Sequence, residues 1–127
     1  MNWIDADQLI HIHDRLLQYG KGVPGMPDPD RASAICSRIL NRHYYEGVND
    51  IFELAATYLV AVARGHIFND ANKRTALMTT IIFLGNNSIL LQYEGFDLEE
   101  LTVGAATGEY PPERVADMLR KLAGRDE

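Results

Sequence analysis

A chain of 127 residues has room for one buried core and predicts a single domain over residues 1–127. With 46% hydrophobic and 24% charged residues, its composition is that of a globular protein. The formal net charge of −6 argues against direct nucleic-acid binding, because little basic surface is left to neutralise a phosphate backbone. Cys36 is the single cysteine, which excludes an intrachain disulfide, and we expect it to pack as a small apolar residue.

The N-terminal residues and the apolar runs were compared with signal peptides and membrane-spanning helices to predict where the protein is located. The first residues lack the basic and apolar regions of a signal peptide. The longest apolar runs are shorter than the roughly 20 residues that a helix needs to cross a bilayer. We therefore expect a cytoplasmic protein that makes no membrane contact.

The first predicted helix opens at Asp5, which is expected to act as the N-cap of a capping box completed by Gln8. Gly20 is expected to end it. His13 lies on the apolar face of this helix, so a hydrogen-bonded core histidine is expected rather than a ligand, whereas His11 should be solvated. The apolar face is formed by residues at helical spacing, namely Leu9, Ile12, Leu16 and Tyr19.

Residues 20–29 hold three glycines and three prolines, which excludes a helix and predicts a surface loop. Asp28 is expected to cap the second helix, with Pro29 in its first position. The helix should end near Arg42 and His43, where a cation is favourable. Its core face is predicted to consist of Ala32, Ile35, Cys36, Ile39 and Leu40.

Two strongly apolar stretches, residues 54–63 and 75–84, predict a central pair of buried helices. Asp50 and Glu53 suggest a capping box at the start of the first, and the Gly-Asn-Asn sequence of residues 85–87 suggests the end of the second. Between these two stretches lie nine largely polar residues, His66 to Arg74. We expect the chemistry of the protein in this segment.

If Asn69 caps the helix that follows, residues 70–72 fill its first turn, where backbone N–H groups lack partners inside the helix. Those donors, the positive end of the helix dipole and nearby cations predict a site for an anion, in particular a phosphate. The cations are Lys73 and Arg74, with Arg64 close in sequence. The N–H donors belong to the first turn, which comprises Asp70, Ala71 and Asn72.

Two further side chains of the segment suggest a reaction. Asp70 would place a carboxylate beside bound phosphates, which is how proteins commonly hold Mg²⁺ with few ligands of their own. His66 suits a general base that takes a proton from a hydroxyl, because histidine is the usual side chain for that role near neutral pH. The short segment thus predicts a base, a metal ligand and an anion site.

The contiguous motif His66-Ile67-Phe68-Asn69-Asp70-Ala71-Asn72-Lys73-Arg74 resembles the signature of the Fic/Doc family, in its Doc (death-on-curing) toxin form. The resemblance implies a compact all-α Fic-like bundle of about six helices with residues 20–29 as a flap. In this family the flap holds a target peptide by strand addition. Phe68 is expected to be an apolar anchor of the loop, since the chemistry does not need its ring.

Many Fic enzymes carry His-Pro-Phe-x-Asp/Glu-Gly-Asn-Gly-Arg and a second Arg three residues later, and transfer AMP to a protein hydroxyl. Here Ile67, Ala71, Lys73 and Leu77 replace the Pro, both Gly residues and the second Arg. The Lys73 side chain should obstruct the approach of an α-phosphate to the helix end. Doc-type toxins share this substitution, which implies transfer of the γ-phosphate of ATP to a threonine of elongation factor Tu. AMP transfer remains the alternative.

The resemblance also implies partners. Some Fic proteins carry an inhibitory Ser/Thr-x-x-x-Glu-Gly/Asn motif, which is absent from this sequence. That absence suits the Doc arrangement, in which a separate antitoxin of the Phd type places a helix in a groove of the toxin. We expect a toxin of a bacterial toxin–antitoxin module that arrests translation and is a monomer when free.

The last third of the chain predicts two more helices. Residues 89–93 are β-prone but few, and we expect a brief extended piece or a hairpin arm. A helix should start at Asp97, run through Leu101 and Ala105, and end at Gly108. The final helix is predicted to begin at residues 111–113, and its inward side chains to be Val115, Met118, Leu119 and Leu122.

Two alternatives from other functional classes stay open. His13-Asp14 resembles the dyad of HD metal-dependent phosphohydrolases, although a well-spaced upstream histidine is lacking. The chain could also be a binding module whose site has lost its catalytic function. Activity that needs a transition metal without ATP would support the first, and toxicity independent of His66 and Asp70 would support the second.

Overall fold

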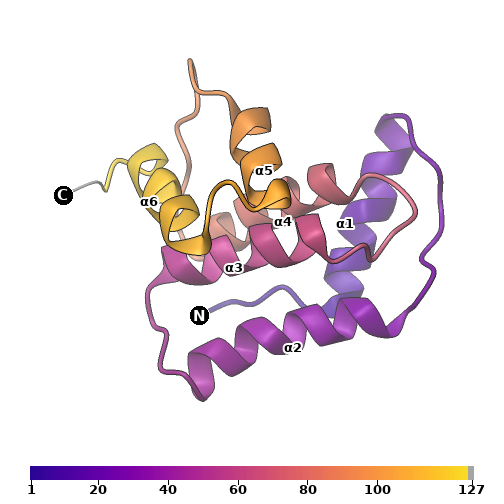
Figure 1. Ribbon diagram of the computed structural model, residues 1–127, viewed down its shortest axis with the longest axis horizontal. Coiled ribbons are helices and arrows are strands. Elements are labelled where there is room, and N and C mark those ends of the chain that lie inside the picture. Colours follow the sequence, from indigo (N-terminus) through magenta and orange to yellow (C-terminus); the bar gives the residue numbers. More distant parts are fainter. Residues whose placement is uncertain (126–127) are drawn as a thin grey trace.

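The computed structural model describes residues 1–125, which form six α-helices and no strand (Figure 1). This confirms the predicted all-α class. The helices are α1 (Ala6–Tyr19), α2 (Asp30–Tyr44), α3 (Ile51–Arg64), α4 (Asn72–Asn86), α5 (Leu98–Thr107) and α6 (Pro112–Leu122). None of the helices in residues 1–125 combines the length and the apolar character that crossing a membrane requires.

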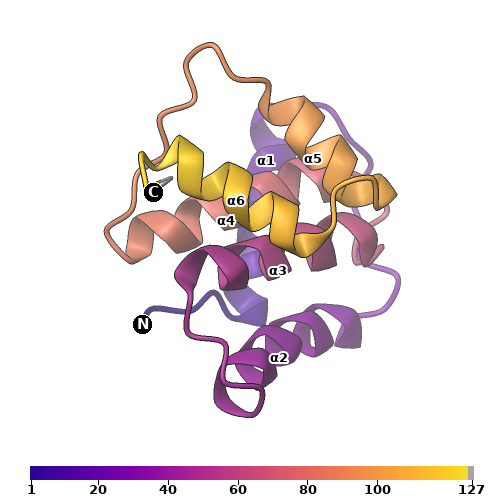
Figure 2. The same cartoon turned by 60° about the vertical axis from the view of Figure 1, so that its left-hand side comes forward.

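Helix α3 lies at the centre of the molecule, with α2 on one side and α5 and α6 on another (Figures 1 and 2). Ten of its 14 residues are buried, as expected for a helix that is apolar on all sides. Its most extensive packing is against α4, which confirms the predicted central pair. Helix α4 is less buried than predicted, because α1, α3 and α5 leave one of its faces open. Met78 is 37% exposed.

The starts of α1 and α3 show which of the predicted capping boxes form. Asp5 and Gln8 form the predicted capping box, with hydrogen bonds of 2.8 and 2.9 Å. Asp50 caps α3 by accepting from the Phe52 N–H, but the predicted capping box with Glu53 is wrong. The second Asp50 oxygen instead accepts a hydrogen bond from Arg120 of α6 at 2.6 Å.

Two other predictions about the helices need correction, and one of two alternatives for residues 89–93 is excluded. Helix α2 begins at Asp30, with Pro29 as N-cap, and the Asp28 carboxylate accepts from the Asp30 N–H. Tyr19 was assigned to the apolar face of α1 but is 80% exposed, because it lies in the last turn of α1, beyond the buried part of that helix. Residues 89–93 form no hairpin arm. They run in an irregular course in which the Gln92 N–H donates to the Leu122 carbonyl.

Other side-chain predictions are confirmed. Cys36 is 7% exposed, and burial raises the pKa of its thiol to about 11, so it remains an inert apolar residue at neutral pH. Asp97 caps α5 by accepting from the Glu100 N–H, and Gly108 ends α5 in the left-handed conformation.

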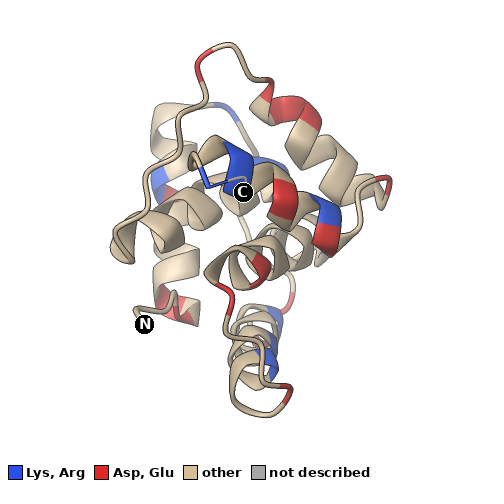
Figure 3. Cartoon of the chain, turned by 90° about the vertical axis from the view of Figure 1, so that its left-hand side faces the viewer, with Lys and Arg blue, Asp and Glu red and all other residues tan. Residues whose placement is uncertain are grey.

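Charged residues of both signs are interspersed over the helices, and several acidic ones lie together at the start of α5 (Figure 3).

Candidate phosphate-binding and catalytic site

The loop between α3 and α4 carries the motif, and α4 begins later than the sequence predicts. Its first residue is Asn72 and its N-cap is Ala71, so the prediction that Asn69 caps this helix is wrong. Asn69 is engaged elsewhere, because its N–H donates to the Gly25 carbonyl and its side-chain amide donates to the Pro24 carbonyl. Both of these bonds hold Asn69 against the loop 20–29.

The start of α4 has no side-chain cap. The first N–H to bond within the helix is that of Thr75, which donates to the Ala71 carbonyl at 2.9 Å. The backbone N–H groups of Asn72, Lys73 and Arg74 therefore have no acceptor inside the helix. Together with the helix dipole and two adjacent cations, they give this end of α4 the donors and positive charge expected of an anion site, displaced by two residues from the predicted position.

A pocket of about 570 Å³ lies directly at this helix end. Its volume is within the roughly 300–1,000 Å³ typical of small-molecule sites. All six residues assigned to the site from sequence line it, together with Arg64 at the end of α3 and Ala106 from α5. The complete lining consists of Ala63, Arg64, His66, Asn69, Asp70, Ala71, Asn72, Lys73, Arg74 and Ala106. Ala63 and Ala106 were not predicted, and their short side chains leave the space open.

Asp70 lies in the loop and its carboxylate accepts two backbone hydrogen bonds. Oδ2 accepts from the Val23 N–H at 3.0 Å and Oδ1 from the Ala71 N–H at 2.8 Å. These bonds, with smaller contributions from the charges of Arg74 and His13, hold the pKa of Asp70 below its ordinary value. An ionised carboxylate has about four lone-pair positions, so two remain for a cation such as Mg²⁺. The residue present fits the predicted metal ligand.

The Asn72 side chain has a different role from its backbone. Its amide nitrogen donates to the Phe68 carbonyl at 2.9 Å, and its oxygen accepts from the Phe68 N–H at 3.1 Å. The side chain therefore braces the loop, and the Asn72 backbone N–H is left without an acceptor in the helix. Phe68 is 4% exposed and stacks on the His13 ring with 3.7 Å between ring centroids, which confirms its prediction as an anchor.

His13 secures the same loop from α1. It is 1% exposed, its Nε2 lies 3.0 Å from the Asp70 carbonyl oxygen, and its Nδ1 lies 3.1 Å from the Asp14 carboxylate. A carbonyl can only accept, so Nε2 carries a proton and donates. The prediction of a hydrogen-bonded core histidine is confirmed. Because both ring nitrogens are engaged within the protein, the arrangement gives no support to the alternative of an HD-type metal site.

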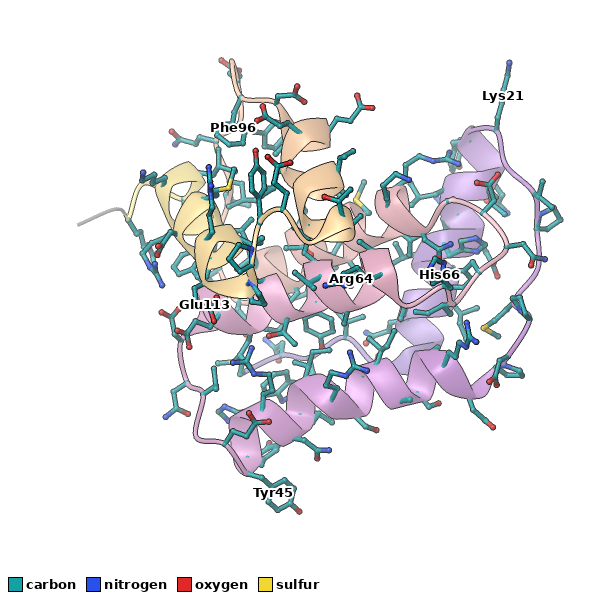
Figure 4. All side chains as sticks on the ribbon, viewed as in Figure 1. Lys21, Tyr45, Arg64, His66, Phe96 and Glu113 are labelled. Atoms are coloured by element: carbon teal, nitrogen blue, oxygen red, sulfur yellow. The ribbon has the colours of Figure 1, made fainter. Side chains whose placement is uncertain are left out.

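His66 is an exposed residue on the rim of the pocket, close to the end of α3 and to Arg64 (Figure 4). Its backbone adopts φ 49°, in the left-handed region, which costs an L-residue about 1–2 kcal/mol. The His66 carbonyl accepts a hydrogen bond from Arg31 Nη1 at 3.0 Å. Sequence reasoning missed Arg31, because it lies 35 positions upstream and no local pattern connects it to the motif.

The loop 20–29 lies against the motif, as a flap would. Arg74 donates to the Lys21 carbonyl at 2.7 Å, in addition to the contacts of Asp70 and Asn69 with this loop. At Gly25, φ is 118° and a Cβ would collide with the Asn69 side chain, so only glycine fits there without a shift. Residues 20–29 thus pack along the motif, although none of them lines the pocket itself.

Comparisons with known proteins agree with this geometry. The model of the Fic/DOC family matches residues 3–84, which include the loop 20–29, the whole motif and most of α4. The chain is 51% identical to "Protein kinase doc" of Escherichia phage P1 over 127 residues, which is the full length of both proteins. The motif, the helical layout and both comparisons lead to one conclusion: this chain belongs to the Fic/DOC family.

Proposed function

We propose that this chain is a protein kinase and the toxin of a toxin–antitoxin module, which transfers the γ-phosphate of ATP to a threonine hydroxyl of elongation factor Tu. The observation that carries the proposal is one pocket that holds His66, Asp70 and the uncapped start of α4 with its two cations. The full-length similarity to a protein named a kinase supports the reaction class.

Each pocket group has a role in this reaction. His66 accepts the proton of the target hydroxyl, whose oxygen then bonds to the γ-phosphorus. The bond from the γ-phosphorus to the β–γ bridging oxygen breaks, and ADP leaves. The N–H groups of residues 72–74 and the cations Lys73 and Arg74 stabilise the charge that develops on the transferred phosphoryl group. Mg²⁺, held by Asp70, would neutralise the phosphate oxygens.

Lys73 favours phosphoryl transfer over AMP transfer. It is exposed at the helix start and lines the pocket where smaller residues occur in AMP-transferring Fic enzymes. Its stem occupies space that an α-phosphate would need, whereas its ammonium can bind the outer phosphates. Intact-mass analysis of the modified target distinguishes the two reactions, because a kinase adds one phosphate and an AMP transferase adds a nucleotide.

The biological setting is part of the same proposal. Modification of elongation factor Tu would arrest translation in the bacterial cytoplasm, and a Phd-type antitoxin would restrain the toxin by placing a helix in one of its grooves. The loop 20–29 would hold the target segment beside His66 by strand addition, which its irregular backbone and its position along the motif permit. The free toxin is proposed to be a monomer.

The decisive experiment is incubation with labelled ATP, Mg²⁺ and purified elongation factor Tu. We expect His66→Ala to lower transfer by about 10²–10⁴-fold, the usual contribution of a general base. Its fold should be unchanged, because the His66 side chain is exposed. His11→Ala is the matched control, since His11 is an exposed histidine outside the pocket. Undiminished transfer by His66→Ala would refute the proposed base.

A further inference from the structure

The carbonyl of His66 is held by a side chain from a different helix. Arg31, in the first turn of α2, donates from Nη1 to this oxygen at 3.0 Å. Within residues 1–125 it makes the only hydrogen bond from another element to residues 64–66. Arg31 is half exposed and lines no part of the pocket, so it does not touch the region where phosphates are proposed to bind.

The conformation of His66 makes this contact important. Its φ of 49° places Cβ, and therefore the imidazole, in a direction that a right-handed conformation would not give. The neighbouring residues are fixed by packing. Gly65 lies so close to Ile35 that a Cβ would collide with it, and Ile67 is completely buried. The His66 peptide group between them is fixed by Arg31.

The same guanidinium lies near the end of the loop 20–29. Arg31 Nε is 4.0 Å from the Asp28 carboxylate, which itself accepts a hydrogen bond at the start of α2. An arginine presents its five N–H donors in a rigid fork, so it can face two acceptors in fixed directions at once. Arg31 therefore joins the last residues of the loop 20–29 to the backbone of the proposed base.

We propose that Arg31 is a positioning residue for the transfer reaction. It holds the His66 backbone in the left-handed conformation that directs the imidazole toward the pocket and the incoming hydroxyl. The inference rests on the proposed role of His66 as base. Because Arg31 acts through the base and not on the nucleotide, its removal should lower kcat and leave the KM for ATP almost unchanged.

The test compares Arg31→Ala and Arg31→Lys with Arg38→Ala, a matched exposed arginine of α2 whose side chain forms no hydrogen bond or salt bridge within the described residues. With labelled ATP and elongation factor Tu, Arg31→Ala should lose about 10–100-fold in kcat, with the KM for ATP within about twofold of the wild type. Arg31→Lys retains a donor and should recover part of the loss. Arg38→Ala should behave as the wild type.

A second measurement needs no activity. The ¹³C shifts of the His66 Cα and carbonyl report its backbone conformation and its hydrogen bond, and both should move in Arg31→Ala but not in Arg38→Ala. Wild-type kcat in Arg31→Ala, or unchanged His66 shifts, would overturn the proposal. So would an equal loss in kcat in Arg38→Ala, or a loss explained by unfolding in circular dichroism, because either would indicate a purely structural role.

The two proposals can fail separately. If the wild-type protein transfers no phosphate, or His66→Ala transfers it normally, the proposed function fails, whereas the His66 shifts still decide whether Arg31 fixes this backbone. If the wild type is active, His66→Ala is inactive and Arg31→Ala equals the wild type, only the inference about Arg31 fails.

Discussion

Helices α1 and α4 begin in opposite ways. At the start of α1, Asp5 and Gln8 exchange hydrogen bonds with each other's backbone and satisfy local donors. At the start of α4, Ala71 has no side-chain acceptor, takes the left-handed conformation and leaves three N–H groups without an intrahelical acceptor. The first start satisfies its own donors, whereas the second leaves donors facing the pocket, as the proposed phosphate site requires.

The difference extends to the surroundings of the two starts. The α1 cap is made by residues three positions apart, so the local sequence is sufficient to form it. The α4 start is held by distant groups, with His13 on the Asp70 carbonyl and Arg31 on the His66 carbonyl. A helix start without a side-chain cap needs its preceding loop to be held by other elements, because a mobile loop could place its own acceptors on the free N–H groups.

The largest expected effect of breaking the α4 start comes from Asp70→Asn. Loss of the charge should lower phosphate transfer by about 10²–10³-fold, comparable to removal of a main electrostatic group in other enzymes. The fold should persist, because asparagine keeps one acceptor oxygen for the Val23 or Ala71 N–H. Transfer rates measured against Mg²⁺ concentration test this. A variant with the rate and Mg²⁺ dependence of the wild type would exclude Asp70 as the metal ligand.

Lys73→Met tests the contribution of the Lys73 charge to the α4 start, because methionine keeps an aliphatic side chain of similar length and removes the ammonium group. A hydrogen bond to a charged group is worth about 1.5–3 kcal/mol, so ATP binding should weaken roughly 10–100-fold. Isothermal titration or the KM for ATP gives the measurement. Lys21→Met is the control, because the Lys21 side chain points away from the pocket at the outer end of the loop (Figure 4). An equal effect of both variants would indicate a general charge effect.

Asp5→Ala tests whether the N-cap of α1 contributes to stability alone. Loss of the N-cap should lower the free energy of unfolding by about 1 kcal/mol. Transfer activity per folded molecule should not change, since Asp5 lies outside the pocket. Urea denaturation followed by circular dichroism measures the first quantity and the labelling assay the second. A specific loss of activity in the folded variant would contradict the assignment of this cap to stability alone.

Ala71→Gly should have the smallest effect. Glycine removes the cost of a left-handed alanine, about 1 kcal/mol, but loses more backbone entropy on folding by a similar amount. We expect the free energy of unfolding to stay within about 0.5 kcal/mol of the wild type and transfer to continue. A large loss of activity would mean that the Ala71 methyl group itself shapes the pocket.

Much of the fold and of the candidate site could be predicted from the sequence. Periodic apolar residues and capping side chains such as Asp5 and Asp97 predicted six helices, because these interactions act over one or two turns. The contiguous motif predicted six residues that line one pocket, since they belong to one short loop and the helix start that follows it. Local signals were misleading where distant groups held the same residue, as at Asn69, which donates to the loop 20–29, and at Asp50, whose second oxygen accepts from Arg120.

The sequence by itself determined the helical class, the position of the motif between two buried helices and the identity of its charged groups, because periodicity and neighbouring residues specify all three. Only the tertiary structure decided where α4 begins, which N–H groups stay free and how His66 is oriented. These outcomes depend on carbonyls and donors brought together from α1, α2 and the loop 20–29, up to 57 positions from the residues they hold. Hydrogen bonds at such separation leave no pattern in the local sequence.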